Sequence, residues 1–424
     1  MQTLKLTKKY EKYPEYKDSG FGWLGVIPSD WKMRKLSQLF KMIGSGTTPD
    51  EKYLTDLGIG IPWVNTGDLT DEYIESPSKR VLPEALRDIS TLRLYSKKAV
   101  IIAMYGATIG KLGIPKFDFC TNQACCVLEN PINSVSEKYI YFWLLGHKKN
   151  IIELAVGGGQ PNINKEIVRS LRISLPHKDT QEKVLLYLEK KTSLIDQAIQ
   201  NKVGLIETLK EKRTSVINTS IIKAVGEKGK LKNYIQLNPS KRGIFATSPE
   251  DVVSFVPMEA ISELGELRLQ ERKYKDVSSG FTYFRNGDVV LAKITPCYEN
   301  GKAGVMKGLK NDFGFGTTEF MVLRPSNKIL SDYLYYIVFS DKFRKMGEVE
   351  MRGTAGQKRV TSSFVMNYEL SIPDIKTQEK IVVELNKKMK LFDAAIAKVE
   401  TSISYLKEFK TSLISNVVTG KVKV

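Results

Sequence analysis

The C-terminal part of the chain carries apolar side chains at alternating spacings of four and three residues. Pro373 precedes this stretch, and neither glycine nor proline interrupts it before Gly420. This alternation marks the seam of a helix that packs against another helix, so it predicts a helix of about 40 residues and roughly 60 Å. The seam positions are Leu385, Met389, Phe392, Ile396, Val399, Ile403, Leu406, Leu413 and Val417, with Lys410 interrupting them.

A second copy of this pattern begins at Ser174. It aligns without gaps to the stretch that begins at Ser371, over roughly 44 residues with about 20 identities. We expect the two helices to pack against each other through their seams, although two separate surface helices would show the same pattern. The first copy has seam residues Leu188, Ile195, Ile199, Ile206, Leu209 and Val216, interrupted by Thr192, Lys202 and Arg213.

Both predicted helices have a proline shortly before them and polar residues at their start. In the first copy Asp179 and Glu182 have the spacing of a capping box, and in the second copy Thr377 is the predicted N-cap.

The rest of the chain forms two blocks, residues 1–173 and 230–372, which share a weaker pattern. "SKKAVIIAMYGATIGKLGI" from Ser96 is similar to "RNGDVVLAKITPCYENGKAGV" from Arg285, and "GGGQPNINKE" from Gly157 stands where "GTAGQKRVTS" from Gly353 stands. Short apolar strands between polar turns predict mixed α/β (α+β) domains. The expected order is therefore block 1–173, helix 174–229, block 230–372 and helix 373–424.

Charge and composition narrow the possible partners. Lys and Arg number 65 against 47 Asp and Glu, a formal charge of +18, which favours a polyanion such as nucleic acid. The N-terminus lacks the apolar core of a signal peptide, and the longest apolar runs are too short to span a bilayer. Four cysteines without metal-site spacing are expected to be buried free thiols of a cytoplasmic protein.

No stretch carries a usable catalytic motif. "GATIGKL" from Gly106 has one residue too few between its glycines for a phosphate-binding loop, and Leu112 stands where Ser or Thr is required. We therefore expect a binding protein with no catalytic, cofactor or metal site of its own.

Polar and basic residues in the turns of both blocks are the candidates for that binding. Lysine and arginine can neutralise phosphates, as expected of Lys79, Arg80, Lys241 and Lys293, whereas Asn, Gln and Arg can read base edges. The candidate DNA-binding residues are Thr47, Thr48, Lys79, Arg80, Tyr105, Lys111, Gln160, Asn162, Asn164, Lys241, Arg242, Lys293, Tyr298, Asn300, Lys302, Arg352, Gln357, Lys358 and Arg359.

Taken together, the chain resembles the specificity subunit of type I restriction-modification systems over nearly its whole length. The resemblance rests on "WLGVIPSDWKMRKLSQLF" with "GSGTTP", on "AMYGATIGKLGI" and "TNQA", on "GFTYFRNGDVVLAKITPCYENGKAG" with "GFGTTEF", and on the two "P…TQEK" helices.

The resemblance implies a division of labour. The two blocks would be target recognition domains that each read half of a split double-stranded DNA sequence, with half-sites about one duplex turn apart. The helices, packed antiparallel, would hold two modification (methyltransferase) subunits around a pseudo-twofold axis. S-adenosylmethionine would belong to those subunits, and ATP and Mg²⁺ to restriction (motor-nuclease) subunits, in a prokaryotic cytoplasm.

Some alternatives stay open at this point. The chain could serve a methyltransferase without a nuclease, or be a basic coiled-coil scaffold. Identities between the two helices, such as Gln181 with Gln378 and Lys210 with Lys407, could mark either a docking face or the helix–helix face.

Overall fold

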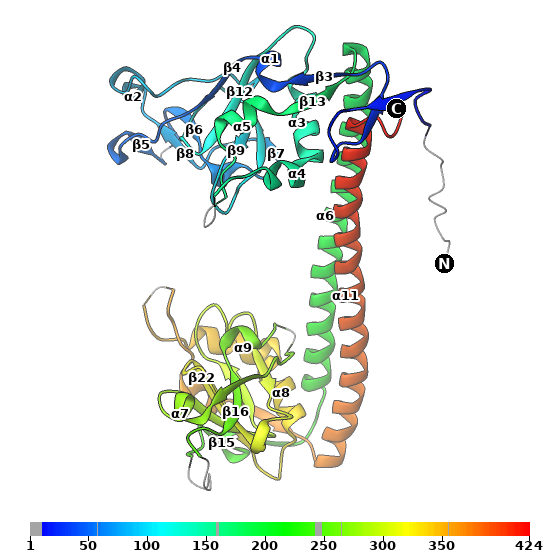
Figure 1. Ribbon diagram of the computed structural model, residues 1–424. Helices are drawn as coiled ribbons and strands as arrows, with labels where there is room; N and C mark the ends of the chain where they lie inside the picture. The colour runs from blue at the N-terminus through cyan, green and yellow to red at the C-terminus, as the bar shows by residue number, and fades with distance from the viewer. Residues whose placement is uncertain (1–10, 57, 158–160, 242–247, 264, 355) are drawn as a thin grey trace. The chain divides into compact units, whose positions relative to one another are not determined.

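The computed structural model describes residues 11–424 except 57, 158–160, 242–247, 264 and 355. The chain forms two compact units, the first of residues 1–200 with 402–424 and the second of residues 201–401. Two long helices, α6 (Lys178–Ile222) and α11 (Ile375–Val418), contribute a stretch to each unit. In each unit a stretch of α6 lies beside a stretch of α11 and beside a sheet-rich part, which confirms the mixed α/β class (Figure 1).

The sheet-rich part of the first unit is built around a five-stranded sheet ordered β4-β12-β9-β10-β7 and a four-stranded sheet ordered β11-β6-β8-β5. Two strand pairs, β1-β2 and β13-β3, accompany them. The strands are β1 (Tyr16–Asp18), β2 (Val26–Pro28), β3 (Lys32–Lys35), β4 (Phe40–Ser45), β5 (Leu54–Thr55), β6 (Ile61–Val64), β7 (Glu72–Ile74), β8 (Lys79–Val81), β9 (Val100–Ala103), β10 (Leu112–Pro115), β11 (Cys120–Thr121), β12 (Cys125–Pro131) and β13 (Arg172–Leu175). The short helices are α1 (Leu36–Leu39), α2 (Glu84–Asp88), α3 (Glu137–Gly146), α4 (Lys148–Glu153) and α5 (Lys165–Ser170).

The second unit repeats this plan with two four-stranded sheets, β15-β22-β19-β20 and β17-β16-β21-β18, and the pair β14-β23. The strands are β14 (Glu227–Lys230), β15 (Ile235–Leu237), β16 (Val252–Val256), β17 (Gln270–Lys273), β18 (Thr282–Arg285), β19 (Val289–Ala292), β20 (Ala303–Val305), β21 (Phe313–Gly316), β22 (Phe320–Pro325) and β23 (Glu369–Ile372). The short helices are α7 (Tyr274–Val277), α8 (Ser331–Phe339), α9 (Asp341–Val349) and α10 (Ser362–Asn367).

A fully buried glutamine fixes the start of α6 to its own sheet-rich part. The Gln181 side chain accepts a hydrogen bond from the Ser136 amide at 2.9 Å and donates to the Ser134 and Pro176 carbonyls at 2.9 and 3.0 Å. One side-chain amide thus bonds three backbone groups around the start of α6.

Gln378 makes the equivalent three hydrogen bonds at the start of α11. It accepts from the Leu330 amide at 2.9 Å and donates to the Lys328 and Pro373 carbonyls at 3.0 and 2.8 Å. Since Gln181 and Gln378 are both fully buried, neither the docking face nor the helix–helix face explains their identity, and both earlier interpretations of this pair are wrong.

The predicted capping residues are also wrong. Helix α6 begins directly after His177, and Asp179 lies inside the first turn with its carboxylate 3.4 Å from the His177 Nδ1 atom. Helix α11 is capped by Asp374, which accepts from the Thr377 amide and the Thr377 hydroxyl, each at 2.9 Å. These hydrogen bonds lower the pKa of Asp374, and they place Thr377 in the first turn.

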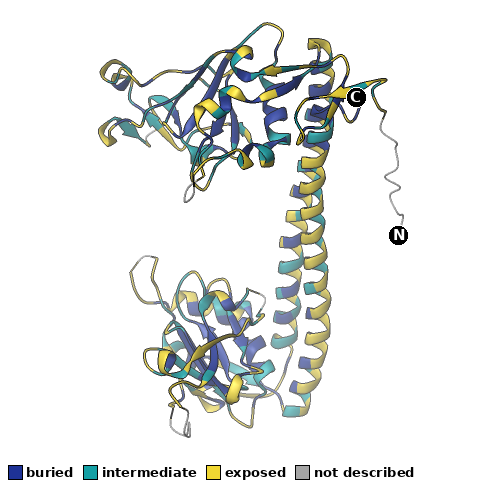
Figure 2. Ribbon diagram, in the orientation of Figure 1, coloured by how far each residue is buried: buried dark blue, intermediate teal, exposed yellow. Residues whose placement is uncertain are grey.

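The seam positions of both long helices are buried or half-buried. Along both long helices the dark, buried positions recur on one side and the exposed positions on the other (Figure 2). The buried seam residues are Leu188, Ile195, Ile199, Ile206, Leu385, Met389, Ile396, Leu413 and Val417, and the half-buried ones are Leu209, Val216, Phe392, Val399, Ile403 and Leu406.

Two of the three charged residues that interrupt the seams, Arg213 and Lys410, are paired with the opposite helix. The Arg213 Nε atom lies 3.2 Å from Asp393 Oδ1, and the Lys410 Nζ atom lies 2.7 and 2.8 Å from the two carboxylate oxygens of Asp196. In the repeat, Arg213 corresponds to Lys410 and Asp196 to Asp393. Moving forward along α6 from Asp196 to Arg213 moves the partner back along α11 by the same number of residues, so the helices are antiparallel. Of the other two interruptions, Thr192 is buried and donates to the Leu188 carbonyl at 2.8 Å, and Lys202 is half-buried.

We expect the two ion pairs to differ in their contribution to stability. The Arg213 side chain is only 3% exposed, and burial raises the pKa of Asp393 although Arg213 opposes this. Asp393→Ala would remove the carboxylate from a buried cation and should cost about 3 kcal/mol. Asp196→Ala removes the more exposed pair and should cost less than about 1 kcal/mol. Urea unfolding of both variants measures the difference, and equal losses would contradict this account.

The two ends of the described chain meet in the first unit. The Tyr16 hydroxyl donates to the Gly420 carbonyl at 3.0 Å, and the Lys423 amide donates to the Glu11 carbonyl at 2.9 Å. Gly420 has φ +72°, and a Cβ atom there would lie 2.4 Å from Pro28 Cγ. Only glycine therefore fits this close approach.

Three of the four cysteines are buried as predicted. Burial raises the pKa of Cys120, Cys125 and Cys126 to about 12 each, and Cys297 is half-buried. Over the part of the chain that the structure describes, none of the helices combines the length and apolar character that crossing a membrane needs.

Candidate nucleic-acid interface

In the first unit two loops that carry predicted DNA-binding residues are held together by backbone hydrogen bonds. We call residues 104–111 and 156–164 the first loop pair, described apart from 158–160. Asn162 forms β-bridges with Tyr105 and Val156, and the Ile163 amide donates to the Met104 carbonyl at 2.7 Å. The first loop follows β9, the middle strand of the five-stranded sheet, so the end of this strand positions both loops.

The second unit repeats this arrangement. We call residues 293–302 and 352–361 the second loop pair, described apart from 355. Arg359 forms β-bridges with Ile294 and Arg352, and the Val360 amide donates to the Lys293 carbonyl at 2.8 Å. The first loop here follows β19, as its counterpart follows β9.

The two loop pairs end in the same way. Asn164 caps α5 by accepting from the Ile167 amide at 2.9 Å, and Thr361 caps α10 by accepting from the Phe364 amide at 3.1 Å. Asn162 and Arg359 therefore occupy equivalent positions, separated by the same number of residues as Gln181 and Gln378.

Arg359 is held by a carboxylate. Its Nη2 and Nε atoms lie 2.8 and 2.9 Å from the two oxygens of Glu319, and its Nη1 donates to the Gln357 carbonyl at 3.2 Å. The hydrogen bond from Arg359 lowers the pKa of Glu319, and nearby Lys293 acts in the same direction. Glu319 is therefore ionised at neutral pH.

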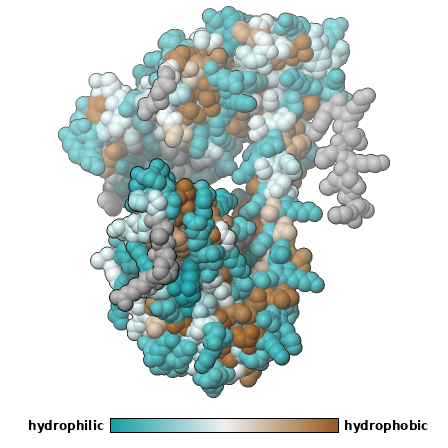
Figure 3. All heavy atoms as spheres, turned by 60° about the horizontal axis from the view of Figure 1, so that its bottom comes forward, coloured by the Kyte–Doolittle hydropathy of each residue, from teal (hydrophilic) through white to brown (hydrophobic). Residues whose placement is uncertain are grey.

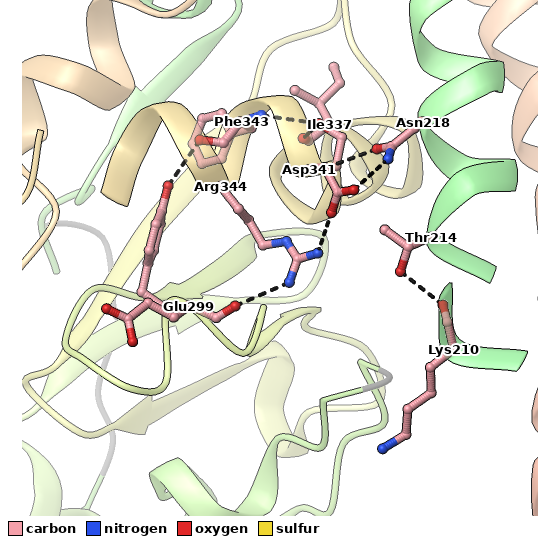
Figure 4. Close-up of polar contacts among 10 residues, drawn as sticks. Lys210, Thr214, Asn218, Glu299, Ile337, Asp341, Phe343 and Arg344 are labelled. Carbon is pink, nitrogen blue, oxygen red and sulfur yellow. Dashed lines mark hydrogen bonds and ion pairs between the residues drawn. The ribbon is translucent and has the colours of Figure 1, made fainter. Parts of the chain in front are cut away.

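In the second unit, helix α9 fixes the first loop of the second loop pair to α6 (Figure 4). The Arg344 guanidinium donates from Nη1 to the Glu299 carbonyl at 3.2 Å and from Nη2 to Asp341 at 2.7 Å. Asp341 in turn accepts from the Asn218 side chain of α6 at 2.9 Å and donates its amide to that side chain at 2.9 Å.

The remaining predicted residues of the second loop pair differ in exposure. Asn300, Arg352, Gln357 and Lys358 are exposed, with Asn300 Nδ2 3.1 Å from Glu263 Oε1. Lys302 is half-buried and donates to the Met258 carbonyl at 3.2 Å.

Tyr298 was wrongly included among the DNA-binding residues. Its ring is fully buried, and its hydroxyl donates to the Phe343 carbonyl at 3.2 Å. The side chain belongs to the core beneath the loop and holds α9.

Near the first loop pair, Thr47 and Thr48 contact residues of the same unit. The Thr47 hydroxyl donates to the Thr91 carbonyl at 3.1 Å, and the exposed Thr48 hydroxyl lies 2.6 Å from Gln123 Oε1. Tyr105 and Lys111, at the two ends of the first loop, are half-buried.

Five further predicted residues lie outside the loop pairs or outside the described residues. Lys79 is exposed and Arg80 half-buried on β8, where Arg80 donates to the Gly60 carbonyl at 2.9 Å. Lys241 contacts the Ser278 carbonyl and lies 5.6 Å above the Phe315 ring. Gln160 and Arg242 fall outside the residues that the structure describes.

Sequence reasoning missed Glu319 and Gln123. Both stand inside stretches already noted for their similarity, "GTTEF" and "TNQA". Glu319 directly precedes β22, and Gln123 lies two residues before β12. The acidic Glu319 between basic loops was a usable signal. A carboxylate repels a polyanion such as DNA, so its presence there indicates a basic side chain that pairs with it.

The two long helices carry a second repeated feature, exposed apolar side chains at equivalent positions. Leu186 and Leu194 on α6 are 73% and 52% exposed, and Val383 and Leu391 on α11 are 69% and 66% exposed. In Figure 3 the visible face is mostly hydrophilic, with apolar patches between. Among the described residues no three His, Cys, Asp or Glu side chains are grouped as a metal site would require.

Comparison with known proteins gives consistent matches. The family model described as "Type I restriction modification DNA specificity domain" matches residues 28–205 and 230–403. The specificity subunit of the type I restriction enzyme EcoAI of Escherichia coli is 42% identical over 166 residues, 38% of this chain and 28% of that protein. The EcoEI specificity subunit of the same species is 39% identical over 188 residues, 44% of this chain and 31% of that protein. The matched part thus spans less than a third of the length of these two relatives.

A solved structure described as "Structural basis underlying complex assembly and conformational transition of the type I R-M system" has a similar fold. Its TM-score is 0.69 at 13% identity, over 93% of this chain and 99% of that chain. At this identity the similarity concerns the fold alone.

Proposed function

Because the chain belongs to the family of type I restriction-modification DNA specificity domains, we propose that it is the non-catalytic DNA-recognition subunit of such a system. Residues 1–173 and 230–372 would be two target recognition domains that each read half of a split DNA sequence. Residues 174–229 and 373–424 would be the helices that hold the partner subunits. The basic coiled-coil scaffold is not favoured, because the family model matches both halves of the chain.

The observation that carries this proposal is the duplicated loop pair with different side chains at equivalent positions. Asn162 in the first loop pair and Arg359 in the second are held by the same backbone bridges. Asparagine and arginine form bidentate hydrogen bonds with different bases. Two loop pairs of the same backbone structure with different base-contacting side chains suit a DNA target whose two halves differ in sequence.

The basic side chains would supply affinity without sequence preference. Lys79, Arg80, Lys241 and Lys293 would contact phosphates, so affinity should fall as salt rises. Among the polar residues, Asn300 and Gln357 are exposed and keep their place as candidate base readers. Asn164 uses its oxygen to cap α5, so only its Nδ2 group could face a base.

Two modification subunits would dock on the exposed apolar pairs of the long helices. Leu186 with Leu194 and Val383 with Leu391 provide the same surface twice, as two copies of one partner require. S-adenosylmethionine would be bound by those subunits, and ATP with Mg²⁺ by restriction subunits. Assembly on chromosomal DNA would take place in a prokaryotic cytoplasm.

Exchange of one recognition domain tests the function. Replacing residues 230–372 with the corresponding block of a relative should change only one half of the methylated sequence in the source cell, because each domain has its own loop pair and its own core. Sequencing of methylated DNA measures the result. The matched control exchanges the first block instead and should change only the other half. If either exchange alters both halves or neither, the model of two independent readers fails.

A further inference from the structure

The second loop pair holds one arginine in a fixed orientation. Arg359 is bonded through its backbone to Arg352 in both directions, with N–O distances of 2.9 and 2.8 Å. Its side chain has five N–H groups, and three of them are taken by the two oxygens of Glu319 and the Gln357 carbonyl. The Arg359 side chain is still 41% exposed, so the two remaining N–H groups can reach a ligand at the surface.

Glu319 is itself fixed at the base of the loops. Its amide donates to the Thr317 hydroxyl at 3.2 Å, and its carbonyl accepts from the Lys293 amide at 2.9 Å. A carboxylate at a surface that attracts DNA repels phosphates. The bidentate contact with Arg359 offsets this repulsion, because the guanidinium neutralises the Glu319 carboxylate.

The first loop pair lacks this arrangement. Asn162 stands at the position of Arg359. The Ala124 carbonyl accepts from the Met104 amide as the Glu319 carbonyl accepts from the Lys293 amide, so Ala124 corresponds to Glu319. The arginine and its carboxylate thus belong to the second recognition domain alone.

We propose that Arg359 reads one guanine in the half-site of the second recognition domain, and that Glu319 is the positioning residue that orients it. A guanidinium forms two parallel hydrogen bonds to O6 and N7 of guanine in the major groove. Holding Arg359 in one orientation limits the side-chain freedom lost on binding and disfavours bases that lack these two acceptors. This inference rests on the proposed function, whose specific DNA target it narrows.

The test uses the chain assembled with its modification subunits. The methylated sequence of the source cell is mapped first, and competitive binding then compares duplexes that differ by one base pair. Arg359→Ala should lower discrimination at one G·C pair of the second half-site by about 10- to 100-fold. Arg359→Lys should resemble Arg359→Ala, because an ammonium group cannot form the bidentate contact.

Glu319→Gln separates positioning from stability. It should lower discrimination at the same base pair by roughly 3- to 10-fold, while the melting temperature and the first half-site stay unchanged. Asn162→Ala is the matched control and should affect only the first half-site. Uniform loss on all sequences with a shallower salt dependence would mark Arg359 as a phosphate contact and overturn the inference. Unchanged discrimination by both Arg359 variants would also overturn it, while the wild-type complex would still support the proposed function. Failure of the wild-type complex to prefer its mapped site would instead reject the proposed function.

Discussion

Aspartate in place of Ile396 should separate α6 from α11 in the second unit. Ile396 is 3% exposed at the middle of the seam. The substitution removes a buried apolar side chain and leaves a carboxylate without a partner, which together should cost more than about 4 kcal/mol. The sheets of the second unit have a separate apolar core around Val256 and Phe284, so we expect them to remain folded while assembly with partner subunits is lost.

The neighbouring residue offers a matched control. Ala397 is exposed on the same turn of α11, so Ala397→Asp adds the same charge without entering the seam and should cost less than about 1 kcal/mol, mostly in helix propensity. Thermal unfolding followed by circular dichroism, together with reconstitution of the complex, measures both effects. An Ile396→Asp variant that melts and assembles like the wild type would show that the seam does not hold the helices together.

Periodicity predicted the long helices and their seam correctly for a physical reason. A helix of about 40 residues repeats one spacing many times, so single interruptions such as Thr192 or Lys410 do not hide the pattern. The duplication shows the same helical pattern a second time, which supports the prediction of both helices. Once Lys410 is seen to pair with Asp196, the repeat also gives the pairing of Arg213 with Asp393, because these two residues are their equivalents.

The errors arose where a single contact decides the structure. Asp374 caps α11 instead of Thr377, because both residues suit an N-cap and only the path of the chain after β23 selects between them. Tyr298 stands in a polar loop but points into the core, where its hydroxyl meets the Phe343 carbonyl. Sequence spacing contains no information on which way such a side chain turns.

Gln181 and Gln378 show why identity between repeats does not identify a shared surface. Each side chain is fully buried and bonds three backbone groups of its own unit. Identity in a duplicated chain can therefore reflect internal anchoring, and exposure must be added before a residue is assigned to docking. Leu186 and Val383 meet this second condition, because both are exposed and equivalent.

Replacing both residues of one exposed apolar pair with aspartate should remove one of the two modification subunits from the complex. Leu186→Asp with Leu194→Asp should abolish one docking surface, and Val383→Asp with Leu391→Asp should abolish the other. Each double substitution should weaken the affinity for the subunit bound at that surface by at least about 100-fold. Because all four side chains are exposed, the folded chain itself should lose less than about 1 kcal/mol.

Native mass spectrometry of the reconstituted complex distinguishes the outcomes. Each double variant should retain one modification subunit, and the variant with all four substitutions should retain none. Leu205→Asp is the matched control, since Leu205 is an exposed leucine of α6 whose equivalent on α11 is Ser402. It should bind both subunits. Two subunits on either double variant would place docking elsewhere on the chain, and loss of both subunits from one double variant would show that the two surfaces are not independent.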